Sequence, residues 1–321
     1  MKIAMLAFCL FILPISDLFM QQKDLPKLTG RYFNQTPPVN VPEIFGQGIV
    51  STSNHEHSPL IFSSDGNEII WSVIPVPFGS GKQKILYIYQ DKGEWTEPIL
   101  FSFSTTTRCG SPVLSPDDKF LYYMEQDPNA PEDAQPKPQI LWRVERNSNF
   151  GWSETERVNK LLPKVKNKIT MSFGFADNGN LYYDLGGRQN DNSEEWDIWM
   201  REYYNGEYSE PIKLGNGIND GEWNWTLFIA PDESYLIWSS NRMNSEDYGD
   251  LYVSFKITDN QWTKPIALGK EINTSQMERF PSVSPDGKYF FFTRNTLENR
   301  GDFFWVDAKF IEEVSARITE K

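Results

Sequence analysis

The two histidines of this chain lie close together and could bind a metal ion. His55 and His57 are the only histidines in the sequence. Residues i and i+2 of a β-strand point to the same side, so both imidazoles could contact one ion, with Cys109 or Glu278 as a third ligand. Two histidines without further ligand spacing form a weak pattern, and both could equally form ordinary hydrogen bonds at the start of a strand. We therefore predict no metal ion and no other cofactor.

Cys109 carries the thiol that could act as a nucleophile. It lies eight residues before Asp117, just as His57 lies eight residues before Asp65. A cysteine–histidine pair between adjacent repeats is therefore conceivable. No third group that would orient the histidine is recognisable, and a free cysteine is commonly a buried apolar residue. The sequence predicts no catalytic residue here.

Carboxylates and tryptophans could instead serve carbohydrate chemistry. Glycoside hydrolysis needs two carboxyl groups about 5–9 Å apart, and Glu56, Glu222 and Glu278 are candidates for them. Trp223 and Trp225 could stack on a sugar ring, or they could be buried in the wall of the protein. Both interpretations stay open at this point.

A sialidase-type site is disfavoured. The aspartate turns of this chain do not match the Ser-x-Asp-x-Gly-x-Thr-Trp turn of sialidase propellers, and only two arginines accompany the candidate residues. The predicted ligand-binding residues are His55, Glu56, His57, Arg108, Cys109, Glu222, Trp223, Trp225, Glu278 and Arg279.

These residues precede a turn that recurs five times along the chain. Each turn combines Ser or Ala, Pro or Asp, and Gly or another turn-forming residue. A short strand rich in aromatic and aliphatic residues follows each turn, and further strand signals complete each unit. The turn aspartates are Asp65, Asp117, Asp177, Asp232 and Asp286, which are 52, 60, 55 and 54 residues apart.

A period of 50–60 residues with four short strands is typical of a β-propeller blade. We predict an all-β, five-bladed β-propeller, because a sixth blade would have to be degenerate and none is recognisable. Helical signals are confined to Ile311–Ile318. The expected blades cover residues 53–103, 104–162, 163–215, 216–270 and 271–318.

The fifth unit lacks its last strand signal, and the start of the chain supplies one. Residues 42–50 align without gaps on residues 265–273, which end the fourth unit. We therefore expect the N-terminal segment to form the outer strand of the last blade. Closing the ring in this way removes unpaired sheet edges.

The turn Ser-Pro-Asp-Gly-Lys at residues 284–288, with the strand Gly-Asp-Leu-Tyr-Val-Ser at 249–254, carries a family resemblance. These motifs resemble the TolB-type, WD-like propeller repeats of bacterial exported proteins. The resemblance implies the fold over nearly the whole mature chain. It implies little about activity, because the motif residues form turns and core.

The beginning of the chain has the pattern of an export signal. Lys2 precedes the mainly apolar run 3–15, which is too short to span a bilayer comfortably. We expect a signal peptide over residues 1–22, a lead-in over 23–41 and one propeller domain over 42–321. A retained membrane anchor is the alternative. The expected location is periplasmic or extracellular, with no membrane insertion after cleavage.

The net charge of −13 disfavours nucleic acid and anionic membranes as partners, and no Lys/Arg cluster stands out in the sequence. Because no constellation combines a nucleophile, a base and an orienting group, we expect a monomeric, non-catalytic binding scaffold. Its partner would be a protein or peptide of the cell envelope, or a glycan, held at the central funnel. The alternative is a carbohydrate-active hydrolase, a lyase or a lectin that uses the funnel carboxylates and tryptophans.

Overall fold

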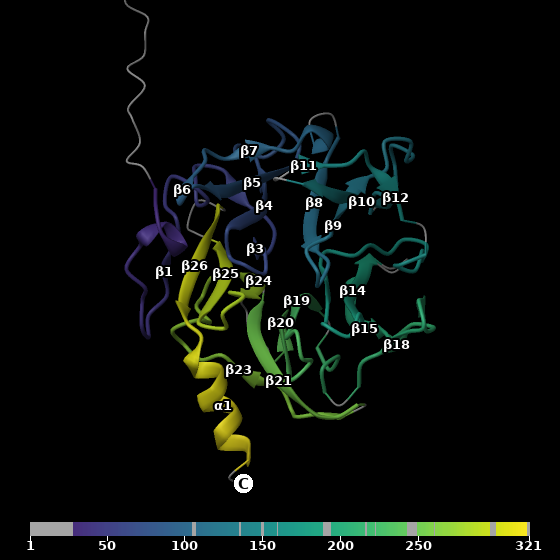
Figure 1. Ribbon diagram of the computed structural model, residues 1–321. Coiled ribbons are helices and arrows are strands. Elements are labelled where there is room, and N and C mark those ends of the chain that lie inside the picture. The colour runs from purple at the N-terminus through teal and green to yellow at the C-terminus, as the bar shows by residue number, and fades with distance from the viewer. Residues whose placement is uncertain are drawn as a thin grey trace, which may run out of the picture.

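The computed structural model is a ring of five antiparallel sheets around a central axis (Figure 1). The all-β, five-bladed propeller predicted from the repeats is thereby confirmed. The residues described are 28–104, 107–134, 136–148, 151–158, 160–188, 194–215, 217–221, 223–242, 249–259, 261–295 and 300–319.

Each blade runs outward from a strand near the axis. Blade 1 contains β2 (His55–Glu56), β3 (Ile61–Phe62), β4 (Glu68–Ile74), β5 (Lys84–Asp91), β6 (Glu94–Trp95) and β7 (Ile99–Leu100). Blade 2 contains β8 (Cys109–Leu114), β9 (Phe120–Gln126), β10 (Gln139–Ser148), β11 (Gly151–Trp152) and β12 (Glu156–Arg157).

The next two blades repeat this plan. Blade 3 contains β13 (Phe173–Phe175), β14 (Leu181–Arg188), β15 (Glu194–Arg201) and β18 (Ile212–Lys213), beside the small hairpin β16 (Tyr203–Tyr204) and β17 (Glu207–Tyr208). Blade 4 contains β19 (Asn224–Ile229), β20 (Tyr235–Ser240), β21 (Asp250–Thr258), β22 (Gln261–Trp262) and β23 (Ile266–Ala267).

Blade 5 is closed by the beginning of the chain. It contains β24 (Glu278–Val283), β25 (Tyr289–Asn295), β26 (Gly301–Asp307) and β1 (Glu43–Ile44). In β1, Ile44 lies opposite Phe304, just as Ala267 of β23 lies opposite Tyr252 in blade 4. The gap-free alignment therefore predicted both the closure and its register.

The recurring turns hold themselves together by side-chain hydrogen bonds. Ser284 Oγ donates to Asp286 Oδ1 at 2.8 Å, and it accepts from the backbone N–H of Tyr289 at 3.0 Å. The turn of blade 2 repeats both bonds from Ser115. The next turn residue, Gly287, has a φ of 72°, a left-handed conformation that glycine adopts without strain. The motif is therefore a structural turn, as expected from the sequence.

The hydrophobic core consists of five clusters, one between each pair of adjacent blades. Between blades 5 and 1, for example, Trp71 packs in the same cluster as Phe291 and Trp305. The helix α1 (Lys309–Thr319) adds Ile311 to the cluster between blades 4 and 5. The helical signal at the end of the sequence thus predicted a real helix. No helix within the described ranges is long and apolar enough to cross a membrane.

The lead-in also seals the junction between the last and first blades. Its short helical turn η1 (Arg31–Asn34) buries Tyr32 and Phe33 in the cluster that contains Trp305. Trp95 of blade 1 donates its indole N–H to the carbonyl of Gly30 at 2.8 Å. Closure thus depends on aromatic packing as well as on strand β1.

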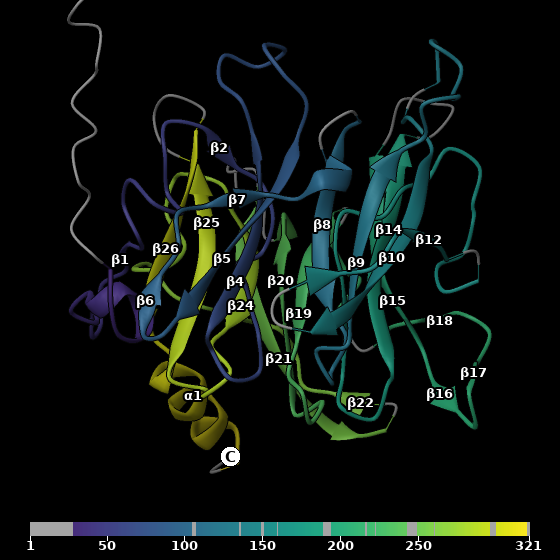
Figure 2. The ribbon, with the colours of Figure 1, turned by 45° about the horizontal axis from the view of Figure 1, so that its top comes forward.

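The two ends of the ring carry different connections between the strands. We call the end that carries the aspartate turns and α1 the turn face, and the opposite end the loop face. On the loop face, the β4–β5 and β9–β10 connections rise above the blades (Figure 2), and both line one cavity. The innermost strands begin on the loop face and run toward the turn face.

Candidate functional site

The pairing of the innermost strands corrects the register deduced from the sequence. Counting eight residues back from each aspartate had placed His57 with Cys109 and Glu278. In the structure, Glu56 pairs with Val73 and Glu278 pairs with Arg294. Val73 and Arg294 each lie eight residues after the aspartate of their turn, so Glu56, and not His57, is the equivalent of Glu278. Blade 1 has one additional residue in the irregular segment between β2 and β3, which shifts the count by one. Two rings of equivalent positions result.

The first ring of positions is buried and structural. Its members are Glu56, Cys109, Asn224 and Glu278, all at most 1% exposed.

The two glutamates of this ring fasten the loops that precede their strands. Glu278 accepts from Thr274 Oγ1 at 2.6 Å and from Arg294 Nε at 2.8 Å. Glu56 accepts from Thr52 Oγ1 at 2.8 Å and from its backbone N–H at 3.0 Å. Burial raises the pKa of both carboxyls, that of Glu56 to about 8. Neither glutamate faces a cavity described here, and Glu222 lies outside the described residues.

Cys109 belongs to the core between blades 1 and 2. It packs with Ile70 and Leu121, and burial raises the pKa of its thiol. In the corrected register, Cys109 pairs with Glu125 and belongs to the first ring, whereas His57 belongs to the second ring. The two side chains therefore do not occupy equivalent positions in adjacent blades. Within the described ranges, no group of three metal-binding side chains was found.

The second ring of positions lies one residue further along the innermost strands, and two of its members, His57 and Gly110, line the cavity at the funnel mouth. It comprises His57, Gly110, Trp225 and Arg279. His57 belongs to it because its N–H bonds to the carbonyl of Ser72, and Ser72 occupies the same place in blade 1 as Thr293, the partner of Arg279, does in blade 5. Bulges follow this position in β8, β19 and β24, where Ser111, Thr226 and Phe280 have positive φ values of 52°, 47° and 52°.

Five polar side chains meet at the funnel mouth, and we call them the funnel cluster. They are His55, His57, Gln83, Arg108 and Arg279. Four of them were predicted from the sequence to bind a ligand, and the structure brings these four together. Gln83 was missed, because it lies in the loop before β5 and belongs to no recurring motif.

Arg279 is the most unusual member of the funnel cluster. It is only 6% exposed, and its Nε has no hydrogen-bond partner. One terminal nitrogen lies 3.3 Å from Asn295 Oδ1 and 3.5 Å from His55 Nε2. The N–H of Gly301 donates to His55 Nδ1 at 2.8 Å, so a neutral His55 carries its proton on Nε2 and offers Arg279 no acceptor.

Burial alone lowers the pKa of Arg279, to about 10, which still leaves the guanidinium charged at neutral pH. Among the described residues, no carboxylate forms an ion pair with Arg279. A buried cation without a carboxylate is costly for a folded protein. The site is therefore suited to binding an anionic group.

His57 and Arg108 line a cavity of about 230 Å³ at the funnel mouth, with Gln83 and Ser111 also in its wall. Arg108 Nε donates to Gln83 Oε1 at 3.4 Å, and Gln83 Nε2 donates to the carbonyl of His57 at 3.1 Å. Burial and the charges of Arg279, His55 and Arg108 hold the pKa of His57 well below its usual range, so its imidazole is neutral.

The predicted tryptophans form an aromatic cluster beside Arg279. Trp225 lies 5.9 Å from Trp223 and 5.6 Å from Trp196, measured between ring centroids. The guanidinium carbon of Arg279 lies 5.9 Å from the centroid of the Trp225 ring, a cation–π distance. Trp223 and Trp225 are partly buried rather than fully enclosed.

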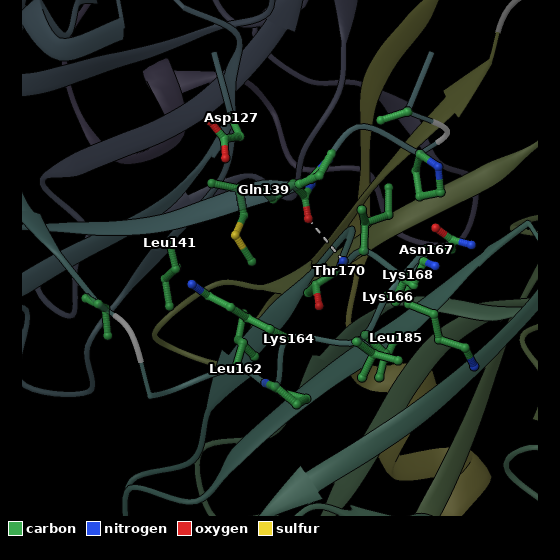
Figure 3. Close-up of a pocket in the computed structure, with 18 of the residues that line it drawn as sticks. Asp127, Gln139, Leu141, Leu162, Lys164, Lys166, Asn167, Lys168, Thr170 and Leu185 are labelled. Atoms are coloured by element: carbon green, nitrogen blue, oxygen red, sulfur yellow. Dashed lines mark hydrogen bonds between the residues drawn. The ribbon is translucent and has the colours of Figure 1, made fainter. Parts of the chain in front are cut away.

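A second cavity, the side cleft, adjoins the funnel mouth between blades 2 and 3. It has a volume of about 390 Å³ and is shown in Figure 3. Lys164, Lys166 and Lys168 belong to the segment before blade 3 that borders the cleft, and Arg157 comes from β12. Gln139 accepts a hydrogen bond from the N–H of Thr170 at 3.1 Å and joins the two blades across the cleft. Although no Lys/Arg cluster stood out in the acidic sequence, these four basic residues gather around one cavity.

Comparison with known proteins gives the fold and not the activity. No model of a protein family matches the chain, and no curated protein matches it significantly. A solved glycoside hydrolase is similar with a TM-score of 0.53 and 11% identity, over 88% of this chain and 91% of that one. A thermostable family-43 glycoside hydrolase gives a TM-score of 0.51 and 13% identity, over 80% and 90%.

TolB from Acinetobacter baumannii is also among the similar structures, with a TM-score of 0.45 and 13% identity. The match covers 78% of this chain and 54% of the TolB chain. Identities at this level establish a shared propeller fold alone. The resemblance to TolB-type repeats stays a prediction from the motif residues.

Proposed function

We propose that this protein is a non-catalytic binding scaffold that holds a protein or peptide partner at the funnel mouth. The observation that carries the proposal is Arg279, a buried cation without a carboxylate partner among the described residues. Binding sites are concave and contain a few converging polar groups, as the funnel cluster does. Of the three glutamates considered for hydrolysis, Glu56 and Glu278 accept hydrogen bonds from the loops that precede their strands, and Glu222 lies outside the described residues.

We also propose that the protein is exported and acts outside the cytoplasm. The apolar run after Lys2 supports export, and the TolB-type motif at residues 284–288 is typical of exported propellers. A scaffold outside the cytoplasm would meet envelope proteins or peptides.

Glycan binding is the second candidate, and one observation favours it. Trp196, Trp223 and Trp225 form a partly accessible aromatic cluster beside Arg279, and aromatic faces suit sugar rings. A lectin or a carbohydrate-active enzyme would use this cluster.

A binding screen can distinguish a peptide-binding scaffold from a glycan-binding protein. The purified protein is panned against a random peptide library and is also applied to a glycan array, in parallel with Arg108→Gln. We expect peptides to be selected and their binding to weaken at least about fivefold in Arg108→Gln. The melting temperature should stay unchanged, because the side chain of Arg108 is exposed and makes one long hydrogen bond among the described residues. Selection of glycans alone, weakened by Trp223→Ala, would replace the proposal by the second candidate.

A further inference from the structure

We propose that the funnel mouth and the side cleft form one cationic groove, and that this groove binds an extended peptide whose carboxylates alternate with apolar side chains. The inference rests on the proposed function and specifies the chemistry of the partner. It follows from the adjacent positions of the two cavities, from the charge of their lining residues and from the apolar residues of the side cleft.

The two cavities adjoin each other. Met124, Pro136, Gln139 and Ile169 line both of them, so the funnel mouth and the side cleft lie side by side along the junction of blades 2 and 3. An extended ligand bound beside Arg108 would therefore reach the side cleft within a few residues.

The charge of this groove is opposite to that of the chain. The sequence has 44 acidic and 31 basic residues. Among the residues that line the two cavities, six are lysine or arginine, and the one carboxylate is Asp127. The six basic residues are Arg108, Lys137, Arg157, Lys164, Lys166 and Lys168.

Most of these basic side chains form no ion pair within the described ranges. None of Arg157, Lys164 and Lys168 forms an ion pair within the described part of the chain, whereas basic residues elsewhere often do. Lys137 donates only to the backbone carbonyls of Pro131 and Glu132. The positive charge is therefore available to a ligand.

Arg108 lines the funnel end of the groove and is exposed, while Arg279 is buried next to His55 at the same end. Both guanidiniums act on the His57 imidazole, and neither has a carboxylate partner among the residues described. An arginine fork matches the two oxygens of a carboxylate and binds them with charge-assisted hydrogen bonds. We assign the anchoring carboxylate of the peptide to this end.

The floor of the side cleft distinguishes a peptide from an acidic polysaccharide. Leu141, Leu185, Leu162 and Val158 contribute apolar surface beneath the basic rim, the first two at 6% and 5% exposure. A polyuronate has carboxylates but no apolar side chain to fill such a floor. Alternate residues of an extended peptide point to opposite sides, so one side can contact the leucines while the other meets the rim.

The test uses the full chain and three short synthetic peptides with blocked ends. One alternates glutamate with leucine, the second has glutamine in place of glutamate, and the third has lysine. Binding is measured by isothermal titration calorimetry, together with an oligogalacturonate as the carboxylated glycan. The variants are Arg108→Gln and the triple variant Lys164→Gln/Lys166→Gln/Lys168→Gln. The matched control, Lys92→Gln/Lys270→Gln/Lys309→Gln, changes the net charge equally away from the groove.

We expect the glutamate peptide to bind at least about tenfold more tightly than the glutamine peptide. This preference should fall in Arg108→Gln and in the groove triple variant, and it should persist in the control. Glutamate and glutamine peptides that bind equally well would overturn the inference while leaving the proposed function intact. Binding of the oligogalacturonate alone would also overturn it, and the absence of any peptide binding would contradict both proposals.

Discussion

Buried charges on the turn face of this propeller form ion pairs, whereas one buried arginine at the funnel mouth forms none with the carboxylates of the described residues. On the turn face, Glu68 binds Arg146 of the next blade at 2.6 Å, and Glu233 binds Lys256 at 2.7 Å while accepting from the hydroxyl of Tyr182. At the funnel mouth, Arg279 is equally buried but has no carboxylate partner among the described residues. The same chain thus pairs buried charges with carboxylates where they hold blades together, while Arg279 has no such partner within the described ranges. In our proposal, this difference separates structural charges from a charge that serves a ligand.

Removing the closing segment should have the largest effect. A chain that starts at residue 51 loses β1 and the buried side chains of Tyr32, Phe33 and Phe45. We expect it to lose cooperative unfolding or to aggregate, because blade 5 then exposes an unpaired edge and an open aromatic cluster. Thermal melting followed by circular dichroism measures this, with a chain that starts at residue 28 as the control. An unchanged melting curve for the shorter chain would show that the ring does not depend on its closure.

Breaking a paired charge on the turn face should have the next largest effect. Glu68→Ala leaves Arg146 without its carboxylate, and we expect the free energy of unfolding to fall by about 2–4 kcal/mol. Urea denaturation provides the measurement. As a comparison, Lys119→Ala removes an exposed ion pair with Glu145 and should change the stability by less than about 1 kcal/mol. Equal effects of both substitutions would contradict the structural role of the buried pair.

Glu56 should make the stability of the ring depend on pH. Burial, with a further contribution from the charge of Asp302, raises its pKa from 4.5 to about 8. The folded state therefore holds a proton that the unfolded state has lost, and the free energy of unfolding should fall as the pH rises between these two values. Asp184, whose pKa burial raises to about 6, acts in the same direction at lower pH.

The substitution Glu56→Gln isolates this contribution, since the amide keeps an acceptor for Thr52. We expect the variant and the original chain to be equally stable near pH 5. Near pH 8 the variant should be more stable by about 1–3 kcal/mol. Denaturation curves recorded across this range test the prediction, and a difference that does not change with pH would contradict it.

Much of the fold could be predicted from local chemistry. Ser284, Asp286 and Gly287 form a turn that depends only on near neighbours, and the strand after it needs only its aromatic residues. Counting turns therefore predicted the number of blades, and the likeness of residues 42–50 to 265–273 predicted the closure. The packing of Tyr32 against Trp305 joins residues more than 270 positions apart and left no local signal.

The candidate site was only partly predictable. The ring of residues before each turn was found, but one additional residue in blade 1 moved His57 from the ring of Glu278 to the ring of Arg279. Gln83 and the lysines of the side cleft lie in irregular loops, and only the three-dimensional arrangement brings them to the funnel. Lys164, Lys166 and Lys168 do alternate within five residues of the sequence, a local signal that could have been recognised, whereas Gln83 and Arg108 belong to separate segments.

One substitution tests most directly whether Arg279 serves a ligand rather than the fold. Arg279→Met keeps the length of the side chain and removes its charge, and both urea denaturation and calorimetric titration with the glutamate–leucine peptide are carried out on it. Because a buried charge without a carboxylate partner costs stability, we expect the variant to be more stable by about 1 kcal/mol while its affinity for the peptide falls at least about tenfold. A variant that is less stable and binds the peptide as well as the original chain would contradict the account.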